Sequence, residues 1–156
     1  MEALKKFVEQ FGEIPFPYED VVKKGRKYYL IPKATRDLIK TINEDIVHAG
    51  LYLGEYKGQF NTTIHTLNII APHTKKKVIL EHKSAWLFIC QRDVFAHKID
   101  NNDRIKKNSF VIITNEEGEV LGLAKKIKDR EGEIYKNIMD IGDFLRREQS
   151  KKKKRR

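Results

Sequence analysis

The sequence is poor in the residues that build disulfides and metal sites. It holds a single cysteine, Cys90, so no disulfide can form within the chain, and a lone thiol is typical of a reducing compartment. The five histidines are scattered, with none three to five residues from another, whereas a zinc site needs about four converging ligands. We therefore expect no metal site and no cofactor. We expect Cys90 to be a buried packing residue, because no base is implied beside it.

The sequence also lacks long apolar runs and the glycine motifs that bind nucleotides. No stretch reaches the roughly 18 apolar residues that a membrane-spanning helix needs. The N-terminal residues combine helical periodicity with acidic side chains, unlike a secretory signal peptide. Neither a phosphate-binding loop nor a Gly-x-Ser-x-Gly motif is present. We expect a cytoplasmic protein, nucleolar if the source is eukaryotic, that is not an enzyme and has no membrane partner.

Basic charge is abundant, but it is concentrated at one end of the chain. The 156 residues carry a formal net charge of +10, and 40% of them are hydrophobic. Residues 1–75 and 76–150 are each close to balanced, so most of the excess comes from the unbroken run Lys151, Lys152, Lys153, Lys154, Arg155 and Arg156. Such a run is usually solvated, and it attracts a polyanion by releasing condensed counterions. We expect residues 150–156 to be a disordered basic tail.

The first half of the chain alternates helix and strand patterns. One apolar helix face, ending near Gly12, is predicted from Leu4, Phe7, Val8 and Phe11. Residues 26–31 indicate a strand, and Pro32 opens a second helix whose predicted buried stripe is Leu38, Ile39, Ile42 and Ile46. Glycines at 50, 54 and 58 favour a β element with close backbone approach. Residues 60–71 are ambiguous, although their apolar spacing is compatible with a helix.

After a polar, basic stretch at residues 73–77, the pattern changes to short strands. Residues 78–80, 94–95, 110–113, 120–124 and 136–139 each predict a strand. Ser84 is expected to cap a helix through Phe88, and a short last helix starts near Gly142. Short strands with one inserted helix favour a small barrel. The predicted fold class is α+β, with a small N-terminal α/β domain at residues 1–74 followed by a C-terminal β-barrel at residues 75–149.

The basic residues of the second half are the candidate binding residues. Arg92 follows the predicted helix, Lys125 and Lys126 end a strand, and Arg146 and Arg147 lie on the last helix. If strand pairing brings them together, they form one positive face able to contact phosphates. Solubilising surface charge explains the same residues equally well, and their spacing alone does not separate the two interpretations.

Several motifs of the second half resemble the PUA domain. They are the strand at 78–80 with its helix at 85–88, the segment Cys90-Gln91-Arg92-Asp93-Val94-Phe95, and the strand Val120-Leu121-Gly122-Leu123-Ala124. Gln91 and Asn108 stand where this family usually has glycine. Over residues 1–148 the chain resembles the Nip-type large-subunit ribosome biogenesis factors and their archaeal homologues, on residues 50–60, 67–72 and 140–148.

This resemblance implies a PUA-type β-barrel that binds RNA without catalysis. Pre-ribosomal RNA is the implied target, and ribosome-assembly proteins, exosome components among them, are the implied protein partners. An RNA-modification enzyme, or its accessory subunit, is the alternative, although residues 1–75 are short for a catalytic domain. A scaffold that mainly binds proteins is a third possibility, and it would show an exposed apolar patch on the N-terminal domain with weak RNA affinity.

Overall fold

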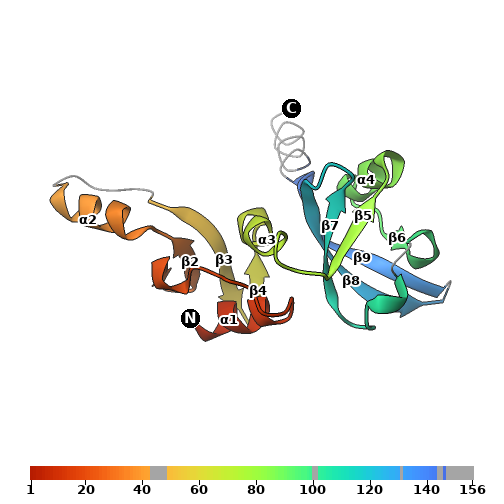
Figure 1. Cartoon of the computed structure of the whole chain (residues 1–156), viewed down its shortest axis with the longest axis horizontal. Coiled ribbons are helices and arrows are strands. Elements are labelled where there is room, and N and C mark those ends of the chain that lie inside the picture. Colours follow the sequence, from red (N-terminus) through yellow and green to blue (C-terminus); the bar gives the residue numbers. More distant parts are fainter. Residues whose placement is uncertain (43–48, 100–101, 131, 144–145, 147–156) are drawn as a thin grey trace, which may run out of the picture. The chain divides into compact units, whose positions relative to one another are not determined.

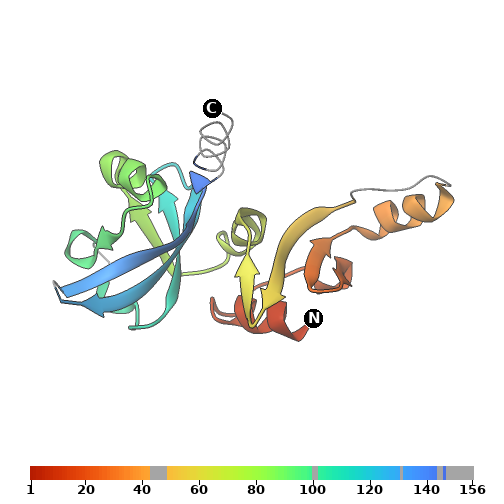
Figure 2. The same cartoon turned by 180° about the vertical axis from the view of Figure 1, so that it is seen from behind.

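The computed structural model describes residues 1–42, 49–99, 102–130, 132–143 and 146. The chain divides into two compact units, Met1–His73 and Thr74–Arg156, and each unit carries its own β-sheet, as Figures 1 and 2 show from opposite sides. The basic tail expected at residues 150–156 lies outside the described residues. Within the described part of the chain, no helix is both long and apolar enough to span a membrane.

The first unit combines helices with a four-stranded antiparallel sheet. The sheet has the order β1-β2-β3-β4. Its elements are α1 (Glu2–Glu9), η1 (Tyr18–Asp20), β1 (Val21–Lys24), β2 (Lys27–Leu30), α2 (Lys33–Thr41), β3 (Leu51–Lys57), β4 (Gln59–Thr62) and α3 (Ile64–Ile70). The expected apolar face of α1 is confirmed, because Leu4, Phe7 and Val8 are all buried. Residues 64–70, ambiguous from sequence, form a helix.

The glycines of this unit confirm the expected close approach of β strands. Gly54 has a φ of +147° on β3, and a Cβ atom there would overlap the carbonyl oxygen of Asn61 on β4. Only glycine tolerates both conditions at once.

The predicted buried stripe of the second helix is wrong. Helix α2 ends at Thr41 and contains no buried residue; Leu38 is 61% exposed and Ile42 is 42% exposed. Ile39 is only partly buried, and Ile46 lies outside the described residues. Helical periodicity identified an amphipathic helix correctly, but it did not reveal whether the rest of the unit covers that face.

The second unit is a five-stranded sheet curved into a half-barrel, with the order β5-β7-β8-β9-β6. Strand β5 runs parallel to β7, and the other pairs are antiparallel. Its elements are β5 (Lys77–Leu80), α4 (His82–Ile89), β6 (Val94–Phe95), η2 (Ala96–Lys98), η3 (Asn102–Arg104), β7 (Phe110–Asn115), β8 (Val120–Asp129) and β9 (Gly132–Asp140).

Apolar side chains of α4 and the sheet form the core of this half-barrel. Phe88 of α4 and Tyr135 of β9 are both fully buried in one cluster with Val111 and Ile113 of β7. Loss of water raises the pKa of Tyr135 to about 12, because burial disfavours the charged phenolate. Gly122 on β8 has no room for a side chain, since a Cβ atom would overlap the carbonyl oxygen of Met139 on β9. Close packing of β8 on β9 therefore requires glycine here.

Two expectations about α4 need correction. The helix begins at His82, after Glu81, so Ser84 lies in its first turn and does not cap it. The Ser84 hydroxyl instead donates to the Glu81 carboxylate at 3.3 Å. Cys90 was expected in the core, but it follows the last residue of α4 and is exposed. Its backbone position at the helix end decides its exposure, whereas the apolar run before it suggested burial.

Candidate functional site

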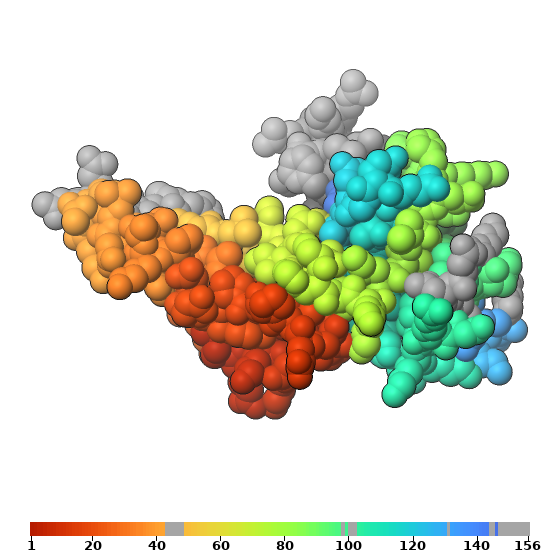
Figure 3. All heavy atoms as spheres, in the orientation of Figure 1, coloured from red at the N-terminus to blue at the C-terminus, as the bar shows by residue number. Residues whose placement is uncertain are grey.

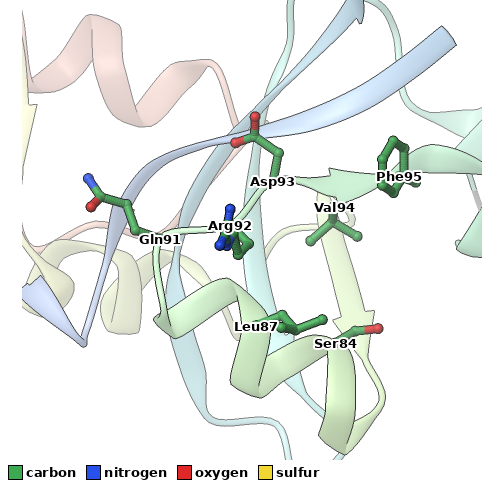
Figure 4. Close-up of a pocket in the computed structure, with 7 residues that line it drawn as sticks. All are labelled: Ser84, Leu87, Gln91, Arg92, Asp93, Val94 and Phe95. Atoms are coloured by element: carbon green, nitrogen blue, oxygen red, sulfur yellow. The ribbon is translucent and has the colours of Figure 1, made fainter. Parts of the chain in front are cut away.

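A hollow of about 510 Å³ opens between α4 and the segment that follows it. Ser84 and Leu87 on α4 form one wall, and residues 91–95 form the other (Figure 4). The lining combines the guanidinium of Arg92 with apolar side chains from Leu87, Val94 and Phe95. Asp93 also lines the hollow, and its carboxylate accepts the backbone N–H of Asn137 at 2.8 Å. The hollow therefore offers a cation beside an apolar surface, which suits a ligand with an anionic group and a flat apolar part.

The backbone at Gln91 shapes the rim of this hollow. Gln91 has a φ of +67°, the left-handed conformation that favours glycine. The Gln91 N–H donates to the carbonyl of Phe88 at 2.9 Å, and the Arg92 N–H donates to the carbonyl of Leu87 at 3.1 Å. These two bonds define a Schellman motif, the usual way in which a left-handed residue ends a helix. Glycine is expected at this position because it adopts the left-handed conformation without steric cost. Gln91 adopts that conformation although it carries a side chain.

A buried carboxylate, Asp140 at the end of β9, fixes the helix end against the sheet. Its side chain is 1% exposed and accepts two bonds of 3.0 Å from the guanidinium of Arg146. It also accepts the N–H of Gly142 at 2.8 Å and the Asn137 amide at 3.1 Å. A buried charge is tolerated only when it is paired and hydrogen-bonded, and Asp140 meets both conditions.

The partners of Asp140 reach from the sheet to the end of α4. The Asn137 amide donates to the carbonyl of Phe88 at 2.8 Å, and Arg146 donates to the carbonyl of Ile89 at 2.7 Å. The last carbonyls of a helix have no partner within the helix, and a cation is favoured there by the helix dipole. The contacts of Asn137 and Arg146 therefore hold residues 91–95 in place and pre-form the hollow.

Of the residues predicted to bind from sequence, Arg92 and Lys125 are accessible. Arg92 is exposed and lines the hollow. Lys125 lies on β8 directly opposite Lys136 of β9, and its ammonium is 5.6 Å from the ring centre of Phe110 on β7. Lysines facing each other across a strand pair repel, so a bound polyanion would relieve the repulsion between these two.

Lys126 does not belong to the predicted positive face. Its side chain is 4% exposed, and its ammonium donates to the carbonyl of Ile105 at 2.9 Å and pairs with Glu133 at 3.2 Å. Successive residues of a strand point to opposite faces, so Lys125 and Lys126 cannot share one surface. Lys126 holds the segment around Ile105 to β8, and its buried ammonium is not accessible to a ligand.

Arg146 is also engaged in structure, through Asp140 and the carbonyl of Ile89. Its side chain remains 32% exposed, so part of it still reaches the surface. Arg147 and the cations from Lys151 to Arg156 lie outside the described residues. Among the described residues, only Lys126 is thus removed from the predicted positive face, and the face as a whole stays a prediction.

The structure adds three residues that the sequence interpretation missed. Ser84 and Phe95 line the hollow with Arg92, and Phe95 is 41% exposed. Lys136 is exposed opposite Lys125. Alternation along the predicted strand at 94–95 would have identified Phe95, because Val94 is buried and its neighbour must then point outward. No cluster of three or more metal-binding side chains occurs among the described residues.

The role of Asp140 gives a first prediction. Asp140→Ala removes the carboxylate that the Arg146 guanidinium, the Asn137 amide and the Gly142 N–H share, so we expect the free energy of unfolding to fall by about 2–3 kcal/mol. Asp143→Ala is the matched control, because Asp143 is 44% exposed and 4.0 Å from Arg146. Chemical denaturation of the two variants measures the difference. An equal, small effect of both would show that Asp140 does not fix the helix end.

The backbone of Gln91 gives a second prediction. Gln91→Gly removes the steric cost of a left-handed residue, and we expect the free energy of unfolding to rise by about 1 kcal/mol. Gln91→Ala keeps a Cβ atom and should leave stability near that of the parent protein. Thermal denaturation of both variants is the measurement. A glycine variant no more stable than the alanine variant would contradict a strained helix end.

Comparisons with known proteins agree with the fold of the second unit. The family model described as the UPF0113 PUA domain matches residues 76–149. A UPF0113 protein from Archaeoglobus fulgidus is 23% identical over 162 residues, covering 96% of this chain and 92% of the relative. The solved structure of a conserved PUA domain protein from Thermoplasma acidophilum superposes with a TM-score of 0.57 at 14% identity, covering 90% of this chain and 87% of that one.

These likenesses establish the fold of the second unit. The expected PUA fold is confirmed for the C-terminal unit, where the family match and the half-barrel coincide. The chain also has an archaeal relative over nearly its whole length. Residues 76–149 thus have a PUA-type fold and are similar to the UPF0113 PUA domain.

Proposed function

We propose that the chain binds RNA in the hollow between α4 and residues 91–95. The observation that carries this proposal is that the Arg92 guanidinium and the exposed ring of Phe95 line the same hollow of a PUA-type fold. Sequence-specific proteins that bind RNA usually take unstacked bases onto aromatic or guanidinium planes. The hollow supplies both kinds of plane within four residues of chain.

The chemistry of the lining gives a role to Arg92, Phe95, Gln91 and Ser84. Arg92 contacts a phosphate or stacks on a base, since a guanidinium can do either. Phe95 offers a stacking surface, which is sequence-tolerant because every base has a flat face. Gln91 and Ser84 supply donors and acceptors for base edges. Lys125 and Lys136 extend the positive surface along the backbone of the RNA, and the cations of residues 151–156 add attraction without stacking.

We further propose that the bound RNA is pre-ribosomal RNA of the large subunit and that the protein is a non-catalytic assembly factor. The support is the resemblance over residues 1–148 to the Nip-type biogenesis factors. Ribosome-assembly proteins, including exosome components, are the corresponding partners, and the cytoplasm or nucleolus is the corresponding location. An RNA-modification enzyme, or its accessory subunit, is the alternative that a PUA-type fold also fits.

Arg92 provides the test of the RNA site. Arg92→Ala should weaken binding of a short single-stranded RNA about tenfold, because one charge-assisted contact in the hollow is lost. For single strands, the log–log dependence of affinity on salt should also flatten by about 0.7 if that contact is to a phosphate. Fluorescence anisotropy at several salt concentrations measures both quantities.

The matched control is Arg104→Ala, which removes an exposed arginine of the same unit that does not line the hollow. Deletion of residues 150–156 should lower the affinity for every RNA by a similar factor and leave the preference among RNAs unchanged. The RNA site is misplaced if the Arg92 and Arg104 variants bind alike.

The absence of catalysis is tested on the pure protein. We expect no base modification, methyl transfer or RNA cleavage when the protein is incubated with ribosomal RNA fragments and the usual methyl donor. Mass spectrometry of the nucleosides is the measurement. A reproducible modified nucleoside that disappears with the Arg92→Ala variant would instead favour the enzyme alternative.

A further inference from the structure

Helix α4 borders a second, smaller hollow of about 240 Å³ on another of its faces. His82, Trp86 and Ile89 of α4 line this hollow, whereas Ser84 and Leu87 line the first one. The opposite wall is the turn between β7 and β8, which lies directly beside α4 (Figure 3, turn in cyan, helix in light green). We call this second hollow the Trp86 groove.

The Trp86 groove has an accessible apolar part of its lining, which we call its floor. Trp86 is 62% exposed, Ile141 is 44% exposed, and Ile89 completes the apolar surface. A large exposed aromatic side chain in a concave site has the character of a binding hot spot, where tryptophan is enriched. Contiguous exposed apolar surface of this kind marks interaction sites more often than chance exposure.

The rim of the groove is acidic. Glu116, Glu117 and Glu119 line it from the β7–β8 turn. The Glu119 carboxylate is fixed in place, because it accepts the Asn115 amide at 2.7 Å while its own N–H donates to the same side chain at 2.7 Å. Among the described residues, none that lines the groove is a lysine or arginine, although the whole chain contains 32.

This charge pattern disfavours RNA, the ligand proposed for the first hollow. Three carboxylates around an apolar floor repel phosphates and attract cations. An occupant that complements both features carries lysine or arginine side chains around an apolar residue. RNA offers neither a cation nor an aliphatic side chain, whereas a basic protein segment offers both.

We propose that the Trp86 groove docks a lysine- and arginine-rich segment of a partner protein, which places one bulky apolar side chain against Trp86. The cations of that segment face Glu116, Glu117 and Glu119. This segment and RNA do not compete for the same residues, because no residue lines both hollows. The protein then holds RNA on one side of this helix and a basic protein segment on another.

The chain supplies its own reporter for this proposal. Trp86 is the single tryptophan of the sequence and it lines the groove, so its fluorescence reports occupancy directly. The probes are three synthetic peptides of about twelve residues. One carries lysines around a central leucine pair, the second replaces the lysines by glutamate, and the third replaces the leucines by serine.

We expect only the first peptide to shift Trp86 emission to the blue and to protect it from acrylamide quenching at moderate salt. The double variant Glu116→Gln/Glu117→Gln should bind this peptide about tenfold more weakly, since two rim charges are lost. The matched control Glu9→Gln/Glu13→Gln removes two carboxylates of the first unit and should bind like the parent. Near-native near-ultraviolet spectra of both variants verify that they are folded.

Other occupants would give different results. Equal responses to the lysine and glutamate peptides, or no loss in the rim variant, would overturn the proposal. A blue shift with a short RNA that the rim variant strengthens would assign the groove to RNA. A change of Trp86 emission on deleting residues 150–156, or on raising the protein concentration, would assign it to the chain's own tail or to a second copy.

Discussion

The buried carboxylate of Asp140 is the constraint on which the binding surfaces of the second unit depend. It is 1% exposed, so its charge must be paired in place. Arg146 and Asn137 both satisfy this carboxylate, and both also bond to the last carbonyls of α4. The burial of one charge thus fixes the position of a helix end. Residues 91–95 follow this helix end directly, so its position also determines theirs.

Helix α4 separates two surfaces of opposite character. Ser84 and Leu87 face a hollow that contains Arg92 and Phe95, while His82 and Trp86 face a groove rimmed by glutamates. The spacing of three and four residues along one helix turn produces this separation. A helix with one buried stripe, around Ala85 and Phe88, leaves the stripes on either side free to carry different chemistry.

Local patterns in the sequence predicted the elements well, and long-range contacts limited the prediction of the site. The apolar spacing of Leu4, Phe7 and Val8 predicted α1, and the glycine at 54 indicated a close approach of two strands. Lys126 was misplaced because strand register, including an irregularity between Leu123 and Ala124, decides which lysine points inward. The structural role of Arg146 depends on the burial of Asp140, which no sequence pattern predicts.

The most direct test of the account is an amide NMR titration of the whole chain with a short single-stranded RNA. If RNA occupies the hollow beside Arg92, the largest shifts will fall on Leu87 and residues 91–95. The amides of Glu116 and Glu117, at the acidic groove, will remain near their starting positions. Large shifts at those glutamates, or shifts confined to residues 1–73 with none at 91–95, would contradict the placement of RNA on this face of α4.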